Sequence, residues 1–354
     1  MSAWKKPYAA AFLRRGARID LYHTIADLLA AEFALEKALA TATETMQAQR
    51  KTFEARPLHH WRRALTRGRF ASEVAQWVPA SEAMIFAAYG RVPAEALFAG
   101  AARVAEMRSR QTTAVRDAVA MPLVLAATTL AMLWGAGEVF IPAMDPILPP
   151  DKWPWTGRIF RNLALFVHTW PHAIGAGLVL AGLAARLVLL RWKGPGRAFL
   201  DRIAPFSIYR TVVGSAFLFV LLEYLRAGLD LNDRTFDELK RAASPYTRHR
   251  IATIQGGMRG GVSLGKAMMT SGHGFPDPTL SPVVAALDGV PEWDAKLGRF
   301  VDRWILRSES LMRARSAAIN VILTLFVTAL IIGVTQSLFE IMNAAGRTTS
   351  AGQY

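Results

Sequence analysis

Two long apolar segments near the middle of the chain dominate its pattern of hydrophobic and polar positions. The first, 118–136, has 19 residues without a charge, and the second, 173–190, has 18 residues with Arg186 as its only charge. A helix needs about 20 apolar residues to cross the hydrocarbon core of a bilayer, and both segments reach that length with their flanks. The Pro- and Trp-rich stretch between them predicts a tight interfacial loop. A third apolar run, 317–339, predicts a third spanning helix.

The polar segments around these runs also follow a helical period. Apolar residues recur at helical spacing in 17–49, and no alternating β-branched pattern appears in the sequence. The Ala-, Glu- and Arg-rich stretch 94–117 continues into the first apolar run without a breaker, and 294–316 continues into the third. We therefore expect two long helices that leave polar domains and enter the membrane.

One more helix, 211–229, is very apolar but has a shorter uncharged run. That run, 211–222, is about 12 residues long, too short to span a membrane, so we expect a buried core helix of a soluble domain. Glu223 follows it directly. A buried carboxylate must be paired, and Arg210 or Arg226 could serve as the partner. The alternative is that Glu223 lies on an exposed face at the helix end.

The predicted fold is an all-α, polytopic membrane protein with three transmembrane helices and two repeated cytoplasmic helical-bundle domains. The predicted segments are cytoplasmic domain 1 (1–117), transmembrane helix 1 (118–142), a periplasmic loop (143–162), transmembrane helix 2 (163–190), cytoplasmic domain 2 (191–316), transmembrane helix 3 (317–340) and a periplasmic tail (341–354).

The charge distribution sets the expected orientation in the membrane. The net charge is +15, and the blocks 1–117 and 191–316 each carry a net +7. Basic residues near span ends mark the cytoplasmic side, so both blocks are expected there, with the N-terminus cytoplasmic and the C-terminus periplasmic. Because membrane orientation explains the positive charge, nucleic acid is a disfavoured partner. The start of the chain is basic and has no apolar region, so we expect no secretory signal peptide. The sequence contains no cysteine, which excludes disulfides and thiolate metal sites.

The two polar blocks share weak sequence matches in the same order. The matching pairs are 30–35 with 226–231, 68–74 with 261–267, and 78–79 with 275–276, at offsets of 196, 193 and 197. A common order and a nearly constant offset indicate a duplicated helical domain. The alternative is chance similarity between Ala-rich helices.

A set of short motifs in the second block resembles one known family. The stretch 193–205 reads KGPGRAFLDRIAP and is followed by Tyr209-Arg210, then by an apolar helix that ends at 227–229 with AGL. Gly261-Val-Ser263-Leu and Phe275-Pro276 come later. These motifs resemble the inner-membrane platform proteins of type IV pili and type II secretion systems, the GspF/PilC family. The resemblance covers nearly the whole chain.

The resemblance implies a set of partners and a set of candidate residues. The expected partners are a cytoplasmic hexameric assembly ATPase, pilin or pseudopilin, other inner-membrane assembly proteins, membrane lipid and further copies of the chain. The residues singled out for partner contact or as repeat motif are Glu32, Gly68, Pro79, Asp201, Pro205, Glu223, Gly228, Gly261, Ser263, Phe275 and Pro276. The sequence departs from the family at Glu32, where the family prefers glycine, and it lacks the family's Gly-Glu-x-x-Gly-x-Leu turn at 89–93 and 288–292.

Motifs for catalysis or cofactor binding are weak. Gly260-x4-Gly265-Lys266 nearly spells a phosphate-binding loop, but alanine follows the lysine and no strand is predicted before it. His168 and His172 are four apart, yet Pro171 lies between them and no carboxylate is near in sequence. We expect no catalytic residue, no cofactor and no metal, and therefore no enzyme.

The sequence thus predicts a multi-pass protein of the bacterial inner membrane that acts as the platform of a type IV pilus assembly machine. The equivalent platform of a type II secretion system is the first alternative. A small membrane transporter or channel is a more remote one, because paired polar residues inside the predicted spans are few.

Overall fold

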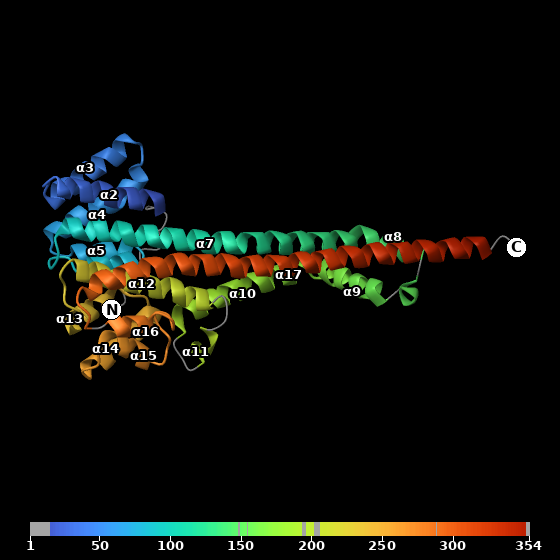
Figure 1. The fold of residues 1–354 in the computed structure, drawn as a ribbon. Helices are drawn as coiled ribbons and strands as arrows, with labels where there is room; N and C mark the ends of the chain where they lie inside the picture. Colours follow the sequence, from blue (N-terminus) through green and yellow to red (C-terminus); the bar gives the residue numbers. More distant parts are fainter. Residues whose placement is uncertain are drawn as a thin grey trace. The chain divides into compact units, whose positions relative to one another are not determined.

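The computed structural model describes residues 15–147, 149–153, 155–192, 196–201, 206–287 and 289–351. These residues form helices and no β-strand, which confirms the predicted all-α class (Figure 1). The structure divides into two compact units. Unit 1 consists of Met1–Thr112 with Leu187–Ser308, and unit 2 of Thr113–Arg186 with Glu309–Tyr354. We call 15–112 the first half of unit 1 and 187–308 its second half.

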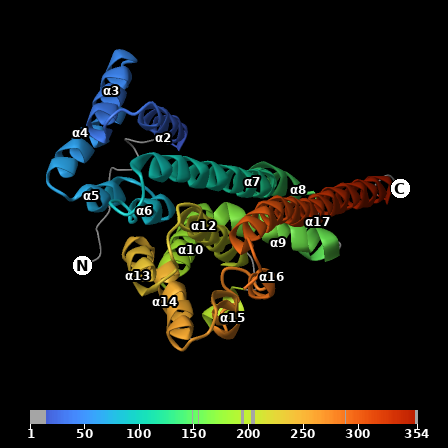
Figure 2. The same cartoon turned by 60° about the vertical axis from the view of Figure 1, so that its left-hand side comes forward.

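Each half of unit 1 consists of short helices followed by a long one. The first half contains α2 (Arg15–Ala30), α3 (Leu35–Ala48), α4 (Thr52–Thr66), α5 (Phe70–Trp77), α6 (Ala80–Phe86) and the start of α7 (Ala94–Gly135). The second half contains α11 (Arg197–Leu200), α12 (Phe206–Arg226), α13 (Asp233–Ala242), α14 (Pro245–Arg259), α15 (Leu264–Thr270), α16 (Ser281–Leu287) and the start of α17 (Trp293–Ala351). The helices α13 to α16 form one group in both views (Figures 1 and 2).

One hydrophobic core holds the two halves of unit 1 together. Phe86 and Phe98 from the first half and Phe217 and Phe275 from the second are fully buried members of the same cluster. Helix α6 contacts both α12 and α13. Each buried aromatic side chain stabilises the fold by roughly 1.5–3 kcal/mol, so a shared core is a strong link.

Unit 2 contains the remaining parts of the long helices and the connection between them. Its other elements are η1 (Ala136–Phe140, a π-helix), α8 (Ile141–Met144), η2 (Pro150–Lys152), α9 (Trp155–Thr169) and most of α10 (Pro171–Arg191). A small core joins η1 and α8 to α9. Gly137 is essential to this contact, because a Cβ there would lie 2.5 Å from the Cβ of His168.

Both predicted long helices are continuous. α7 has 42 residues and α17 has 59, and each runs from unit 1 into unit 2 without an interruption. The predicted second span, 163–190, is instead divided between the end of α9 and α10. The break falls at Trp170, because Pro171 has no N–H and disfavours the helical conformation of the residue before it.

Three helices are long and apolar enough to span a membrane: Leu123–Met144, Pro171–Leu189 and Phe206–Arg226. The first two agree with predicted spans. The third is α12, and the sequence-based conclusion that it is too short was wrong. The polar residues at both ends belong to the same helix, which has 21 residues and a mean hydropathy of 1.5. Its predicted burial is confirmed, since 67% of its apolar window lies inside the protein, against 17% and 0% for the other two.

The predicted third span, 317–340, lies inside α17. Its apolar segment Asn320–Gly333 is shorter than a full span. Large apolar side chains of this segment, including Ile322, Leu325 and Ile332, are more than half exposed. Exposed apolar faces of this kind are typical of surfaces that contact lipid or another protein.

Candidate functional site

The carboxylate of Glu223 lies at the contact between the two halves of unit 1. Its side chain is only 5% exposed. Arg226, one turn along α12, donates from Nη1 to Oε1 at 2.8 Å. Arg103 of α7 donates from Nε to Oε1 at 3.1 Å and also from Nη2 to Oε2. The predicted partner Arg226 is confirmed, and the predicted alternative of an exposed Glu223 is wrong. We call Arg103, Glu223 and Arg226 the Glu223 node.

The Glu223 node touches both long helices. A Cβ at Gly100 of α7 would lie 3.2 Å from Oε2 of Glu223, so α7 approaches the carboxylate closely. A Cβ at Gly298 of α17 would lie 3.2 Å from Nη2 of Arg226. One buried acid and its two arginines therefore connect α7, α12 and α17.

A second polar contact extends the packing of α7 on α12. Gln111 of α7 donates from Nε2 to the Oγ of Ser215 at 2.8 Å, and both side chains are buried. Arg103 meets Glu223 and Gln111 meets Ser215, so the two helices run antiparallel along this contact.

Asp201 forms a second buried node, beside the end of α10. Its carboxylate pairs with Nε of Arg197 at 2.9 Å and accepts bonds from Nη2 of Arg250 and from the Tyr246 hydroxyl, both at 3.0 Å. Arg197 also donates to the carbonyl of Val188 in α10 at 3.0 Å. Burial, with the Asp201 charge adding to it, raises the pKa of Tyr246 to about 12. This node, the Asp201 node, connects α10 with α14.

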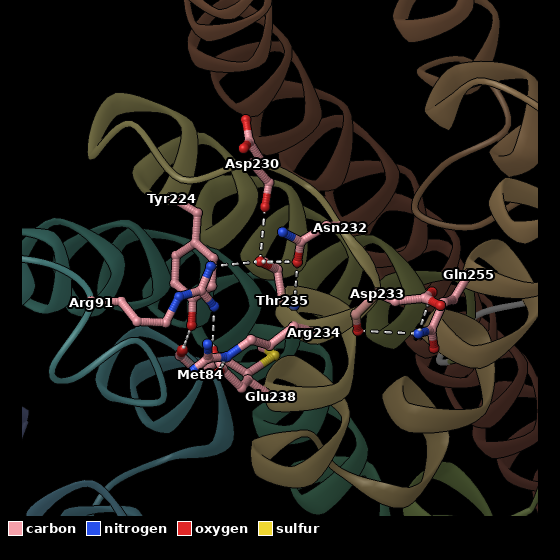
Figure 3. Close-up of polar contacts among 10 residues, drawn as sticks. All are labelled: Met84, Arg91, Tyr224, Asp230, Asn232, Asp233, Arg234, Thr235, Glu238 and Gln255. Carbon is pink, nitrogen blue, oxygen red and sulfur yellow. Dashed lines mark hydrogen bonds and ion pairs between the residues drawn. The ribbon is translucent and has the colours of Figure 1, made fainter.

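Figure 3 shows a further polar junction between the halves, which the sequence did not predict. Arg91 of the first half donates to Oε2 of Glu238 at 2.6 Å and to Oγ1 of Thr235 at 3.1 Å. The Tyr224 hydroxyl donates to the carbonyl of Met84. The end of α12 and the start of α13 thus both contact the first half.

A third buried carboxylate, Glu82 of α6, was also missed. It pairs with Arg18 of α2 at 2.6 Å and accepts the Tyr22 hydroxyl at 2.9 Å. Burial raises the pKa of Glu82, while the positive charge of Arg18 opposes that shift. The network ties α2 to α6 inside the first half.

The singled-out glycines and Glu32 occupy equivalent turns in the two halves. Glu32 (φ +63°) and Gly228 (φ +73°) end α2 and α12, and Gly68 (φ +64°) and Gly261 (φ +77°) end α4 and α14. The backbone bonds of each pair also correspond. The N–H groups of 32 and 33 bond to the carbonyls of 29 and 28, and those of 228 and 229 bond to 225 and 224.

The same correspondence holds for the second pair of turns. The N–H groups of 68 and 69 bond to the carbonyls of 65 and 64, and those of 261 and 262 bond to 258 and 257. These are the bonds of a helix end closed by a left-handed residue.

The other singled-out residues have structural positions. Pro79 and Ser263 precede the first residues of α6 and α15. Phe275 is fully buried against the ring of Phe217, at 5.5 Å between centroids. The carbonyl oxygen of Pro276 would lie 2.4 Å from a Cβ on Gly214 of α12. Pro205 lies outside the described residues.

The structure places the weak chemical motifs on helices and the turns between them. The Gly260–Lys266 stretch joins the end of α14 to α15, and among the described residues no strand precedes it. No group of three or more His, Asp or Glu side chains that could hold a metal ion occurs within the described residues. The structure instead brings Nε2 of His168 within 2.5 Å of Oε2 of Glu138, a pair that sequence spacing did not suggest.

The Glu223 node predicts non-additive stability effects. We expect Arg103→Met or Arg226→Met alone to lower the free energy of unfolding by about 1 kcal/mol, because each arginine is 44% exposed and the other still pairs the acid. The double variant should lose about 3 kcal/mol or more, because it leaves a buried carboxylate unpaired. Thermal and urea unfolding of the full chain in detergent, followed by circular dichroism, measures this.

Arg110→Met, at an exposed position of the same helix, is the matched control and should change stability by less than about 0.5 kcal/mol. Additive losses from the two single variants, or an equal loss from Arg110→Met, would contradict the assignment of the node as a coupled unit.

Comparison of the chain with protein-family models, with curated proteins and with solved structures found no match.

Proposed function

We propose that the chain is the inner-membrane platform of a type IV pilus assembly machine and couples a cytoplasmic assembly ATPase to the insertion of pilin. The observation that carries this proposal is the continuity of α7 and α17 from unit 1 into unit 2. Unit 1 would receive the ATPase, the spans would hold pilin, and the two helices would transmit motion between them. The platform of a type II secretion system is the alternative, because its pseudopilin would be handled by the same parts.

The Glu223 node supports this mechanism. A force that moves one half of unit 1 acts on both long helices, because Arg103 of α7 and Gly298 of α17 meet at the same acid–arginine cluster. A buried ion pair resists separation, since an unpaired charge left in the interior costs several kcal/mol.

The paired turns support a duplicated domain within unit 1, which the family resemblance also implies. Within the described residues, five helices precede the long helix in the same order in each half, α2 to α6 before α7 and α12 to α16 before α17. Two pairs of turns at offsets of 196 and 193 share their positive φ and their backbone bonds. The shared order and turn geometry favour duplication over chance similarity between helices.

The contacts across unit 1 also support one membrane topology over another. If α12 crossed the bilayer after α7 and α10, Glu238 would lie on the opposite side from Arg91, yet the two form an ion pair at 2.6 Å. Spans at α7, α10 and α17 keep both halves of unit 1 on one side. They also keep both +7 blocks in the cytoplasm, where basic residues concentrate.

A transporter is favoured by one observation only. Glu138, within the π-helical η1, forms an acid–base pair with His168 of α9, and such helical irregularities are frequent at functional sites. The pair lies near the end of the span Leu123–Met144. A pathway through the membrane needs several polar groups along its length, so one pair is weak support for a transporter.

The proposed topology can be tested with single cysteines, since the chain has none. We expect Asn343→Cys, near the end of α17, to react with a membrane-impermeant maleimide in intact spheroplasts. Arg241→Cys, on the exposed side of α13, should react only after permeabilisation. The reverse pattern, or reaction of both in intact spheroplasts, would exclude the arrangement with α17 as third span.

The platform function is tested by affinity purification of the tagged full chain from detergent-solubilised membranes, with mass spectrometry of the proteins that accompany it. We expect a hexameric secretion-type ATPase together with a pilin or pseudopilin, and the identity of the pilin distinguishes a pilus from a secretion system. A clean oligomer alone, even after mild cross-linking, would contradict the proposal and direct attention to transport assays in liposomes.

Motion through α7 is tested by insertion of Gly-Gly between residues 113 and 114, where α7 passes from unit 1 into unit 2. We expect pilus assembly to be lost, because two glycines weaken the helix and turn the segments before and after them relative to each other. The variant should still be found in the membrane fraction. Normal piliation would show that an unbroken α7 is not required, and Ala-Ala at the same place separates helix weakening from the change of register.

A further inference from the structure

Helix α11 is held against the last turn of the apolar helix α10. The membrane-length segment Pro171–Leu189 ends in that turn, and none of its apolar window is buried within the protein. Arg197, the first residue of α11, donates from Nη1 to the carbonyl of Val188 at 3.0 Å. Its guanidinium is fixed by the Asp201 node and lies over the ring of Tyr246, at 4.8 Å from the ring centroid. Where α10 crosses a bilayer, α11 therefore lies at the level of the bilayer surface.

The aromatic ring of Phe199 lies on the side of α11 that faces away from the core. Residues two apart in a helix are about 200° apart around its axis, and Arg197 and Asp201, two residues before and after Phe199, are both fully buried. Phe199 itself is 63% exposed, more than any other large apolar side chain in the described part of unit 1. Because burial of such a ring is favourable, its placement outside the core indicates that another apolar phase receives it.

The residues around α11 are of the types that gather at a membrane–water boundary. Trp192, directly after α10, is 39% exposed, and tryptophan is enriched at that boundary. Residues 191–202 contain four Lys or Arg and one acidic residue, Asp201. A basic segment beside a span is attracted to anionic lipid headgroups.

We propose that α11 is a membrane anchor of unit 1 outside the spans, and that Phe199 and Trp192 insert into the interfacial region of the bilayer. The lipid surface is the partner that fits, because the bond from Arg197 to Val188 holds the Phe199 ring near the depth of the last turn of the span. A soluble partner would have to enter the headgroup layer to cover it. The inference depends on α10 as a span and is independent of the platform function.

The depth of position 199 tests the proposal. The chain has no cysteine, so Phe199→Cys gives a single site for an environment-sensitive NBD probe on the full chain in liposomes of phosphatidylcholine and phosphatidylglycerol. Interfacial apolar side chains are buried about 5–10 Å into the boundary of headgroups and acyl chains, so we expect a lipid nitroxide near the top of the acyl chain to quench the probe at least about twofold more than one near its end. Iodide in the water should quench it weakly.

Two further single-cysteine variants calibrate the measurement. Leu180→Cys, at an exposed position within the apolar part of α10, should be quenched most by the deep nitroxide. Arg241→Cys, on the exposed side of α13, should be quenched by iodide alone. The three positions together give the depth of α11 relative to the span and to the water.

Hydrogen exchange of the full chain in nanodiscs tests the anchor without a probe. Phe199→Gln removes the apolar ring, and Phe199→Trp keeps an interfacial aromatic side chain. We expect the amides of α11 to exchange at least about tenfold faster in Phe199→Gln, because loss of the anchor favours local opening of this short helix, and to exchange at the native rate in Phe199→Trp. The amides of α4, in the other half of unit 1, should be unchanged in both variants and report that the core is intact.

Three results would overturn the proposal. Strong iodide quenching at position 199, with no quenching by either lipid nitroxide, would place the ring in water. Protection from iodide and from both nitroxides would mean that protein covers the ring, as in a contact with a second copy of the chain. Equal exchange of α11 in the native chain and in Phe199→Gln would show that the ring does not anchor the helix.

Discussion

A carboxylate that is nearly excluded from water must be paired, and this constraint fixes the arrangement of unit 1. Glu223 satisfies it with one arginine from its own helix and one from α7. Arg226 also lies close to Gly298, so α17 packs against the same cluster. Moving α7 away from α12 would separate Arg103 from Glu223, and moving α17 away would open its packing against Arg226.

At the Asp201 node, a buried carboxylate and its arginines likewise hold α10. Arg197 bonds a carbonyl near the end of that helix and is held in turn by a buried aspartate. Each of the helices that pass from unit 1 into unit 2 therefore meets a buried carboxylate network in unit 1, through a hydrogen bond, an ion pair or close packing. Such networks specify one arrangement, since a shifted helix cannot satisfy them.

The sequence predicted the helices better than the contacts between their side chains. Helical period and the absence of breakers predicted α7 and α17, and apolar length predicted the hairpin. The partner of Glu223 was only half predicted, because Arg226 is within one turn whereas Arg103 is 120 residues away. A single sequence contains no signal for such a distant pair. The length of α12 was misjudged because charges near helix ends do not end a helix.

At the turn that contains Glu32, the departure from the family motif has a conformational cost. The family resemblance implies glycine there, and Glu32 indeed has a φ of +63°, in the left-handed region that glycine adopts without cost. A residue with a Cβ pays about 1–2 kcal/mol in that conformation. The equivalent Gly228 avoids it, so this turn is strained in the first half and not in the second.

Helix length makes the anchors in unit 1 mechanically important. At 1.5 Å per residue, the 42 residues of α7 extend about 63 Å and the 59 residues of α17 about 88 Å, whereas the hydrocarbon core of a bilayer is about 30 Å thick. In the proposed platform, half or more of each helix would therefore lie outside the hydrocarbon. A helix that is anchored only at its membrane end would bend when the other end is pushed. The Glu223 node holds both helices within unit 1, so a displacement there would be delivered to both together.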